Sequence, residues 1–268
     1  MGEDPSFRTD LYRGTARDYD RFRLPYPPSL VDDLRSRARL NGTGRLLDLA
    51  CGTGQVAFAL CGDFDAVTAL DQEPGSVALG QAKADASGLT HIRWQVATAE
   101  EAETDGPFDM IAIGNAFHRL RRQRVAERAL SWLRSGGYVA LLWGGNPTEG
   151  SSDWQEALRA VIADWLHRTG DRLPADWEEA MARDPHEQIL RRAGFSYEGS
   201  HDFDLRNVWT IETLTGYLYS TSILSRQALG DLAPSFEEDL SERILRCRPN
   251  GRMEQDVRFS YQLAHKPG

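Results

Sequence analysis

The 268-residue sequence is poor in cysteine and has no long apolar run, and each shortage narrows the class of protein. Its three cysteines, Cys51, Cys61 and Cys247, lack the paired spacings of zinc sites and disulfide frameworks. We therefore expect a reducing compartment and no metal site. No apolar stretch reaches the roughly 18 residues of a membrane helix, and the amino-terminal residues do not resemble a secretion signal. These absences predict a soluble, cytoplasmic protein that does not act at a membrane.

Net positive charge is also missing, since the formal net charge is -9. Such a chain repels phosphate backbones, so we expect no nucleic-acid partner and a neutral or cationic small molecule as substrate. Its basic residues are almost all arginine, with only Lys83 and Lys266 as lysines, which indicates a GC-rich coding sequence rather than a function. One local cluster is basic, and it is read either as a solvated helix face or as an anion-binding surface: Arg119, Arg121, Arg122, Arg124 and Arg128.

Short apolar runs alternate with helix-period segments from Arg45 onward, which is typical of a parallel sheet flanked by helices. The segment 1–28 ends in a proline-rich stretch, so we expect it to be extended, with a helix starting at Ser29. The predicted strands of this first part are 45–49, 66–70, 92–96, 110–114 and 138–143.

After Trp143 the pattern becomes mainly helical, with strands expected only at 195–203 and 256–264. We predict one domain with a helical cap or lid over the carboxyl edge of the sheet. Its core covers about 29–145, 184–204 and 251–268, its cap covers 146–183 and 205–250, and residues 1–28 form a separate amino-terminal segment.

A strand that runs into a glycine turn, Leu46 to Gly54, is the strongest local signal. The segment Gly52-Thr53-Gly54-Gln55-Val56-Ala57 also fits the dinucleotide pattern G-x-G-x-x-A, so an NAD(P)-dependent oxidoreductase is one reading. Asp48, four residues before Gly52, favours another reading, because a carboxylate repels a pyrophosphate but binds an ammonium group. The ammonium of S-adenosylmethionine fits, whereas a plain structural role would make Asp48 a turn cap.

A second carboxylate, Asp71, ends the second predicted strand, 17 residues after Gly54. An acidic residue at this edge binds ribose hydroxyls in nucleotide-binding α/β folds. Asp71 alone fits any adenosine cofactor, whereas Asp48 and Asp71 together point to S-adenosylmethionine.

These segments resemble the class I S-adenosylmethionine-dependent methyltransferases, in particular the small-molecule branch of types 11 and 25. The matching motifs are the turn 48–54, Asp71, the segment 94–100, the segment 108–118 and the helix stop 133–137. The resemblance implies a Rossmann-like α/β fold with a seven-stranded, mostly parallel sheet whose last strand is antiparallel. It also implies S-adenosyl-L-methionine as cofactor, S-adenosyl-L-homocysteine as product, and no metal.

The resemblance also assigns cofactor-binding residues. Tyr19 and Arg23 would close over the cofactor and its carboxylate, or else serve as an aromatic staple and a surface arginine. Two departures stand out: Ala50 replaces the first glycine of the family pattern, and Thr98 replaces the acid often found beside the adenine. The full predicted set is Tyr19, Arg23, Asp48, Ala50, Gly52, Gly54, Asp71, Gln72, Thr98, Ala99, Asn115 and Phe117.

His118 is the candidate catalytic residue, because it follows the fourth strand at the edge where the methyl group should point. It would act as a general base or orient the acceptor, and the alternative is a packing role. The candidate substrate-binding residues are Trp143 at the end of the fifth strand, and Trp209 and Tyr219 in the cap. For Trp209 and Tyr219, the alternative to substrate binding is packing in the core.

Three functions follow from these patterns. The first is methyl transfer to an oxygen or nitrogen atom of a small molecule, such as a sugar or a specialised metabolite. The second is dinucleotide-dependent oxidation or reduction, which Asp48 disfavours. The third is a non-catalytic regulatory or scaffold protein with the same fold. The sequence leaves the acceptor and the oligomeric state open.

Overall fold

A seven-stranded sheet in the order β3-β2-β1-β4-β5-β7-β6 forms the centre of the computed structural model, which describes residues 12–170 and 182–268. Strands β1 to β5 pair in parallel, and β7 runs antiparallel to β5 and β6. This confirms the predicted fold class and the antiparallel last strand. The strands are β1 (Arg45–Leu49), β2 (Ala66–Asp71), β3 (Ile92–Val96), β4 (Phe108–Gly114), β5 (Leu133–Gly144), β6 (Ser196–Trp209) and β7 (Met253–His265).

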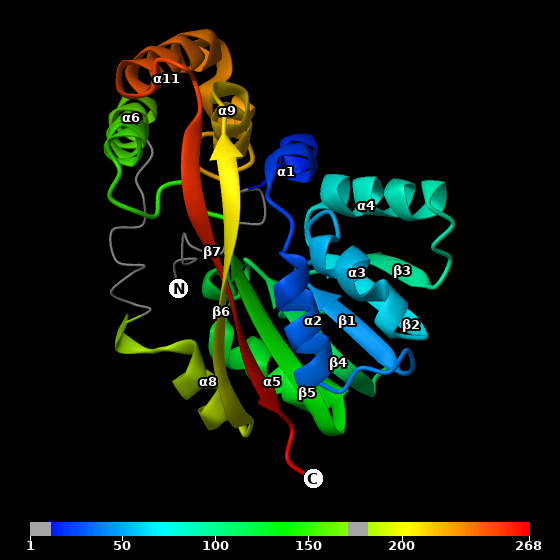
Figure 1. The fold of residues 1–268 in the computed structure, drawn as a ribbon. Helices are drawn as coiled ribbons and strands as arrows, with labels where there is room; N and C mark the ends of the chain where they lie inside the picture. The colour runs from blue at the N-terminus through cyan, green and yellow to red at the C-terminus, as the bar shows by residue number, and fades with distance from the viewer. Residues whose placement is uncertain (1–11, 171–181) are drawn as a thin grey trace.

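The central strands β1 and β4 are buried on both faces, which explains why most of their residues are apolar. In β1, Leu46 belongs to the core cluster under α2 and α3, and Leu47 belongs to the cluster under α5 and α8. The two clusters make a three-layer fold, with helices on either side of the sheet (Figure 1). The helices of these layers are α2 (Pro28–Arg37), α3 (Gln55–Leu60), α4 (Pro74–Ala86), α5 (Arg122–Trp132) and α8 (His186–Ala193).

The amino-terminal segment and the long last strands differ from the prediction. Residues 16–22, expected to be extended, form α1 (Ala16–Phe22), because the helix-breaking prolines begin only at Pro25. Residues 205–209, expected in the cap, are the end of β6. Alternating exposure along β6 makes this stretch a strand with one solvent-facing side, which the helical interpretation overlooked.

Strands β6 and β7 continue as a two-stranded arm beyond their partner β5. The last pairing of β5 is Gly144 with Phe259, whereas β6 and β7 stay paired up to Trp209 and Met253. The arm leads to the cap helices at one end of the molecule (Figure 1). These are α6 (Asp153–Thr169), α9 (Ile211–Tyr219), α10 (Arg226–Leu229) and α11 (Ala233–Cys247). Part of the predicted cap, residues 171–181, and part of the amino-terminal segment, residues 1–11, lie outside the described residues.

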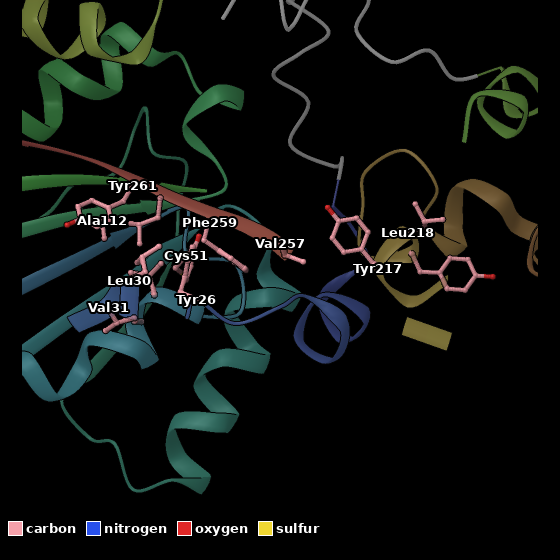
Figure 2. Close-up of a cluster of buried hydrophobic side chains, with 14 of the residues drawn as sticks. Tyr26, Leu30, Val31, Cys51, Ala112, Tyr217, Leu218, Val257, Phe259 and Tyr261 are labelled. Atoms are coloured by element: carbon pink, nitrogen blue, oxygen red, sulfur yellow. The ribbon is translucent and has the colours of Figure 1, made fainter. Parts of the chain in front are cut away.

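One continuous apolar cluster joins the cap to the sheet. Tyr26 packs edge-on against Phe259 of β7, with ring centroids 5.9 Å apart. Figure 2 shows Val257 farther along β7, between this region and the α9 residues Tyr217 and Leu218. The same β7 residues therefore support both the sheet and the cap, which fixes α9 beside the carboxyl edge.

Candidate functional site

The turn after β1 has a left-handed backbone at three residues. φ is +57° at Ala50, +55° at Gly52 and +90° at Gly54. Glycine adopts such angles freely, whereas they cost alanine on the order of 1 kcal/mol. Ala50 therefore keeps the shape that the family pattern obtains from glycine, at some cost in stability.

Asp48 lies beneath this turn and is fully buried. Its Oδ2 accepts a hydrogen bond of 2.8 Å from the backbone N–H of Ala57 in α3. Its Oδ1 has no hydrogen-bond partner in the described part of the chain. Burial, reinforced by the charge of Asp71, raises the pKa of Asp48 to about 7. A buried oxygen without a donor is costly, and a ligand cation would satisfy it.

Asp71 braces the turn from the end of β2. One carboxylate oxygen accepts from the N–H of Gly52 and the other from the N–H of Glu73, each at 2.8 Å. Burial raises the pKa of Asp71, and these two hydrogen bonds act against the shift. Each oxygen keeps further acceptor capacity, so ribose hydroxyls can still bind. Gln72 is half-buried beside it.

Asp71→Ala is expected to weaken the binding of S-adenosylhomocysteine by about tenfold or more, the scale of a hydrogen bond to a charged group. Calorimetry measures the affinity, and thermal unfolding shows whether the variant folds. Asp85→Ala, at an exposed carboxylate of α4, is the matched control. Unchanged affinity in a folded Asp71 variant would mean that another residue binds the ribose.

Other buried polar atoms around the turn also lack partners. Of the seven such side-chain atoms in the described residues, four lie in the motif segments 48–54 and 94–100. They are Asp48 Oδ1, Thr53 Oγ1, Trp94 Nε1 and Thr98 Oγ1. The Trp94 ring packs so tightly on Gly54 that a side chain at Gly54 would overlap it. Ala99, by contrast, is buried in the apolar cluster under α5 and α8. The unpaired atoms of these two motif segments fit a polar cofactor at the carboxyl edge.

Tyr19 and Arg23 cover the turn from α1. A Cβ at Gly52 would lie 3.7 Å from the Tyr19 ring, so the ring is in contact distance of the turn. Burial raises the pKa of Tyr19 to about 12. The Arg23 guanidinium lies between two aromatic rings, 5.1 Å from the Tyr19 centroid and 4.4 Å from that of Tyr217. It donates to Ser220 Oγ at 2.8 Å and to Tyr217 Oη at 3.2 Å. Arg23 thus ties α1 to α9 over the turn.

The chain leaving β4 is held by Asn115 and Phe117. Asn115 Oδ1 accepts from the N–H of Gly144 at 3.1 Å, and its φ of +50° turns the chain sharply. The side chain therefore links the ends of β4 and β5. Phe117 is buried, with its ring edge-on to His186 at 4.9 Å. Through these contacts, Asn115 and Phe117 position His118, which directly follows Phe117 in the chain.

His118 lies in the short helix η3 (Phe117–Arg119), and its side chain reaches solvent. Desolvation by the surrounding protein and the positive charges of Arg119, Arg122 and Arg23 lower its pKa to about 3. The imidazole is therefore neutral at pH 7 and can both donate and accept a hydrogen bond. It is a weak base, which favours an orienting role over proton removal.

The three aromatic residues predicted to contact substrate lie in different surroundings. Trp143 is half-buried, with its ring 6.3 Å from His186, on the same side as His118's helix. Trp209 is buried, and its indole N–H donates to Gln255 at 2.8 Å. Tyr219 is also buried, and its hydroxyl donates to Glu237 at 2.6 Å. The packing of Trp209 and Tyr219 supports the structural alternative for both.

Sequence reasoning missed the residues that hold Arg23 and surround His118. Tyr217 and Ser220 bind Arg23, and their spacing of three places them on one face of α9. His186, from α8, packs on Phe117 and has its pKa lowered to about 4, mainly by burial. The helical spacing of Tyr217 and Ser220 was a usable signal, whereas nothing in the sequence connects His186 with His118.

Three further features concern metal binding, membrane insertion and a cavity. In residues 12–170 and 182–268, no cluster of histidine, cysteine and acidic residues could hold a metal ion, and no helix is long and apolar enough to span a membrane. A cavity of about 490 Å³ lies near the amino ends of β1 and β4, lined in part by Arg45, Arg93 and Asp105. Parallel α/β sheets bind ligands at the opposite, carboxyl edge. We therefore place the site at the glycine turn.

Residues 46–137 match the family model described as a methyltransferase domain. The ubiquinone/menaquinone biosynthesis C-methyltransferase UbiE of Geobacter sp. (strain M21) is 33% identical over 118 residues, 41% of this chain and 49% of that protein. The match thus spans about half the length of this curated relative.

Solved structures share the fold over nearly the whole chain. One described as a type II methyltransferase from Anaeromyxobacter dehalogenans has a TM-score of 0.64 and 18% identity, covering 92% of this chain and all of that one. The cyclase SpnF has a TM-score of 0.54 and 19% identity, covering 89% of this chain and 81% of that one. Because a cyclase shares the fold, the fold alone does not decide the reaction.

Proposed function

We propose that this chain, which contains a class I S-adenosylmethionine-dependent methyltransferase domain, transfers the methyl group of S-adenosylmethionine to an oxygen or nitrogen atom of a small molecule. The family match supports methyl transfer. The acceptor and the residue roles rest on the site.

The observation that carries the proposal is the unpaired Oδ1 of Asp48 beneath the glycine turn. A buried carboxylate with a pKa near 7 gains most from a cationic ligand, such as the ammonium of a methionyl group. The same carboxylate would repel the pyrophosphate of a dinucleotide. This contrast disfavours the oxidoreductase alternative.

The remaining assignments follow from the neighbours of the turn. S-Adenosylmethionine supplies a methyl group already activated on a sulfonium, so the protein mainly aligns the reacting atoms. Asp48 would bind the ammonium, Asp71 the ribose, and Thr98 the adenine edge. Tyr19 would exclude water from above the turn, and Arg23 would face the carboxylate of the cofactor. His118 would orient the acceptor.

A carbon acceptor is the second candidate, because the similar UbiE protein is named as a C-methyltransferase. Transfer from a cofactor with a 13C-labelled methyl group separates the two candidates. The carbon chemical shift of the product distinguishes a methyl group bound to oxygen or nitrogen from one bound to carbon.

The purified protein is expected to bind S-adenosylhomocysteine at least about tenfold more tightly than NAD+ or NADP+, because only the former offers Asp48 an ammonium. Isothermal titration calorimetry with each compound measures the difference. Tight binding of a dinucleotide without binding of S-adenosylhomocysteine would replace the proposal by the oxidoreductase alternative. Binding of S-adenosylhomocysteine without any methyl transfer to a broad acceptor panel would favour the non-catalytic alternative.

A further inference from the structure

Two arginines at the candidate site, Arg23 and Arg119, form no ion pair with a carboxylate of the described residues. The hydrogen bonds of the Arg23 guanidinium go to Ser220 and Tyr217, both uncharged. Arg119 stacks on Tyr12, with its guanidinium carbon 5.5 Å from the ring centroid, and has no carboxylate partner among the described residues. Arginines elsewhere, such as Arg192 and Arg243, bind carboxylates directly.

Arg23 and Arg119 act on the same small region. The positive charges of both lower the pKa of His118 and act against the rise in the pKa of Tyr217. Arg119 directly follows His118 in η3, and both arginine side chains are half-buried. Bringing like charges together in a partly desolvated place without a counter-ion is costly. The arrangement therefore favours a bound anion.

Glu149, the acidic side chain whose charge also acts on Tyr217, does not fill this role. Glu149 affects the pKa of Tyr217, but its carboxylate accepts from Asn146 at 3.4 Å and forms no ion pair with Arg23 or Arg119. Burial raises the pKa of Glu149, and the cation that acts against this shift is Arg258 rather than Arg23 or Arg119. The counter-charge for Arg119 is thus left to a ligand.

The two arginines differ in what they can still bind. Arg23 is fixed by α9 and lies beside Tyr19, over the glycine turn, which suits the cofactor carboxylate of the proposed function. Arg119 lies beyond it, next to His118 and against Tyr12, and its guanidinium donors are not used by described residues. It is placed for a second anion on the acceptor side.

We propose that Arg119 binds a carboxylate group of the methyl acceptor, which makes the acceptor an anion. This inference rests on the proposed function, because it takes the cofactor to lie at the glycine turn. The net charge of the chain led us to expect a neutral or cationic substrate. This inference replaces that expectation by an anionic substrate. Transfer of the methyl group to an oxygen of this carboxylate forms an ester and turns the sulfonium into a thioether, with no proton to remove, so a weakly basic His118 suffices beside it.

The test uses benzoate as a probe carboxylate and benzamide as its neutral match, each titrated into the wild-type protein with and without saturating S-adenosylhomocysteine. We expect benzoate to bind about tenfold more tightly than benzamide, and Arg119→Gln to remove this preference. Arg119→Lys should retain part of it, because the charge remains. Arg124→Gln, at an exposed arginine of α5, is the matched control and should bind like the wild type.

The affinity for S-adenosylhomocysteine separates the two sites. Arg119→Gln should change it by less than about threefold, since Arg119 is assigned to the acceptor. A tenfold loss would place Arg119 at the cofactor instead and would overturn the inference, as would equal binding of benzoate and benzamide to the wild type. Failure of the wild type to bind S-adenosylhomocysteine would contradict the proposed function alone, because benzoate binding without cofactor still tests the anion site.

Discussion

His118→Ala is expected to lower kcat by about 100-fold, the cost of a reacting group held about 1 Å out of place. The affinity for S-adenosylhomocysteine should change by only a few fold, because His118 is assigned to the acceptor. Turnover is measured with an acceptor found by screening small carboxylic acids, and binding is measured by calorimetry. His118→Asn should restore part of the rate, since an amide can still donate and accept hydrogen bonds.

The pH profile separates orientation from proton removal. With a pKa of about 3, His118 stays neutral from pH 5 to 8, so its titration should not change the wild-type kcat in this range. A fall in kcat near pH 6.5 that disappears in His118→Asn would instead identify a general base.

His167→Ala, at an exposed histidine of α6, is the control for His118→Ala. Its turnover should equal that of the wild type. Near-normal kcat in His118→Ala would mean that neither role applies and that alignment by the rest of the site is sufficient.

Asp48→Asn is expected to have opposite effects on cofactor binding and on stability. Loss of a charged hydrogen bond should weaken S-adenosylhomocysteine by about 1.5 to 3 kcal/mol, or roughly 10-fold to 150-fold. The free protein should become more stable at pH 8, because asparagine still accepts from the Ala57 N–H but buries no charge.

The pH dependence of both quantities follows from the raised pKa of Asp48. A folded-state pKa of about 7 exceeds the ordinary value of about 3.9, so the protonated carboxyl favours the folded state. This contribution is present below pH 4 and is lost as the pH rises through 7. The gain in melting temperature from Asp48→Asn should therefore grow from pH 5 to pH 8.

Cofactor affinity should follow the ionised form of Asp48. In the wild type, binding of S-adenosylhomocysteine should strengthen by about tenfold from pH 6 to pH 8, and this change should be absent in Asp48→Asn. Asp105→Asn, which alters an exposed carboxylate, serves as control. Equal affinity of the wild type and Asp48→Asn at pH 8 would remove Asp48 from the cofactor site.

Much of the fold could be predicted because the central strands β1 and β4 are buried on both faces, and the strands of the first part are short runs between helix-period segments. Strands β1 and β3 have the predicted bounds, 45–49 and 92–96. The end of β6 was missed because its exposed positions alternate with half-buried ones, which resembles a polar loop or helix in sequence. Helix α1 was missed because the prolines after it dominated the prediction for the segment 1–28.

The candidate site was predictable where its residues follow each other in the chain. The turn 48–54 and Asp71 could be found because adjacent parallel strands bring their carboxyl ends to one edge. Trp209 and Tyr219 were chosen for their aromatic character, which does not separate a ring that lines a site from one that fills a core. Their burial and their hydrogen bonds with Gln255 and Glu237 favour the core-packing alternative.

The sequence by itself determined the sheet, the glycine turn and the two carboxylates, because each depends on neighbours within a few residues or on regular strand alternation. Only the tertiary structure decided which charges lie beside His118. The net charge of -9 is spread over the whole surface, whereas Arg23 and Arg119 come together through the contact of α1 with α9 and the exit from β4. A charge acts over about 10 Å at ordinary ionic strength, so local packing, rather than composition, sets the field that a ligand meets.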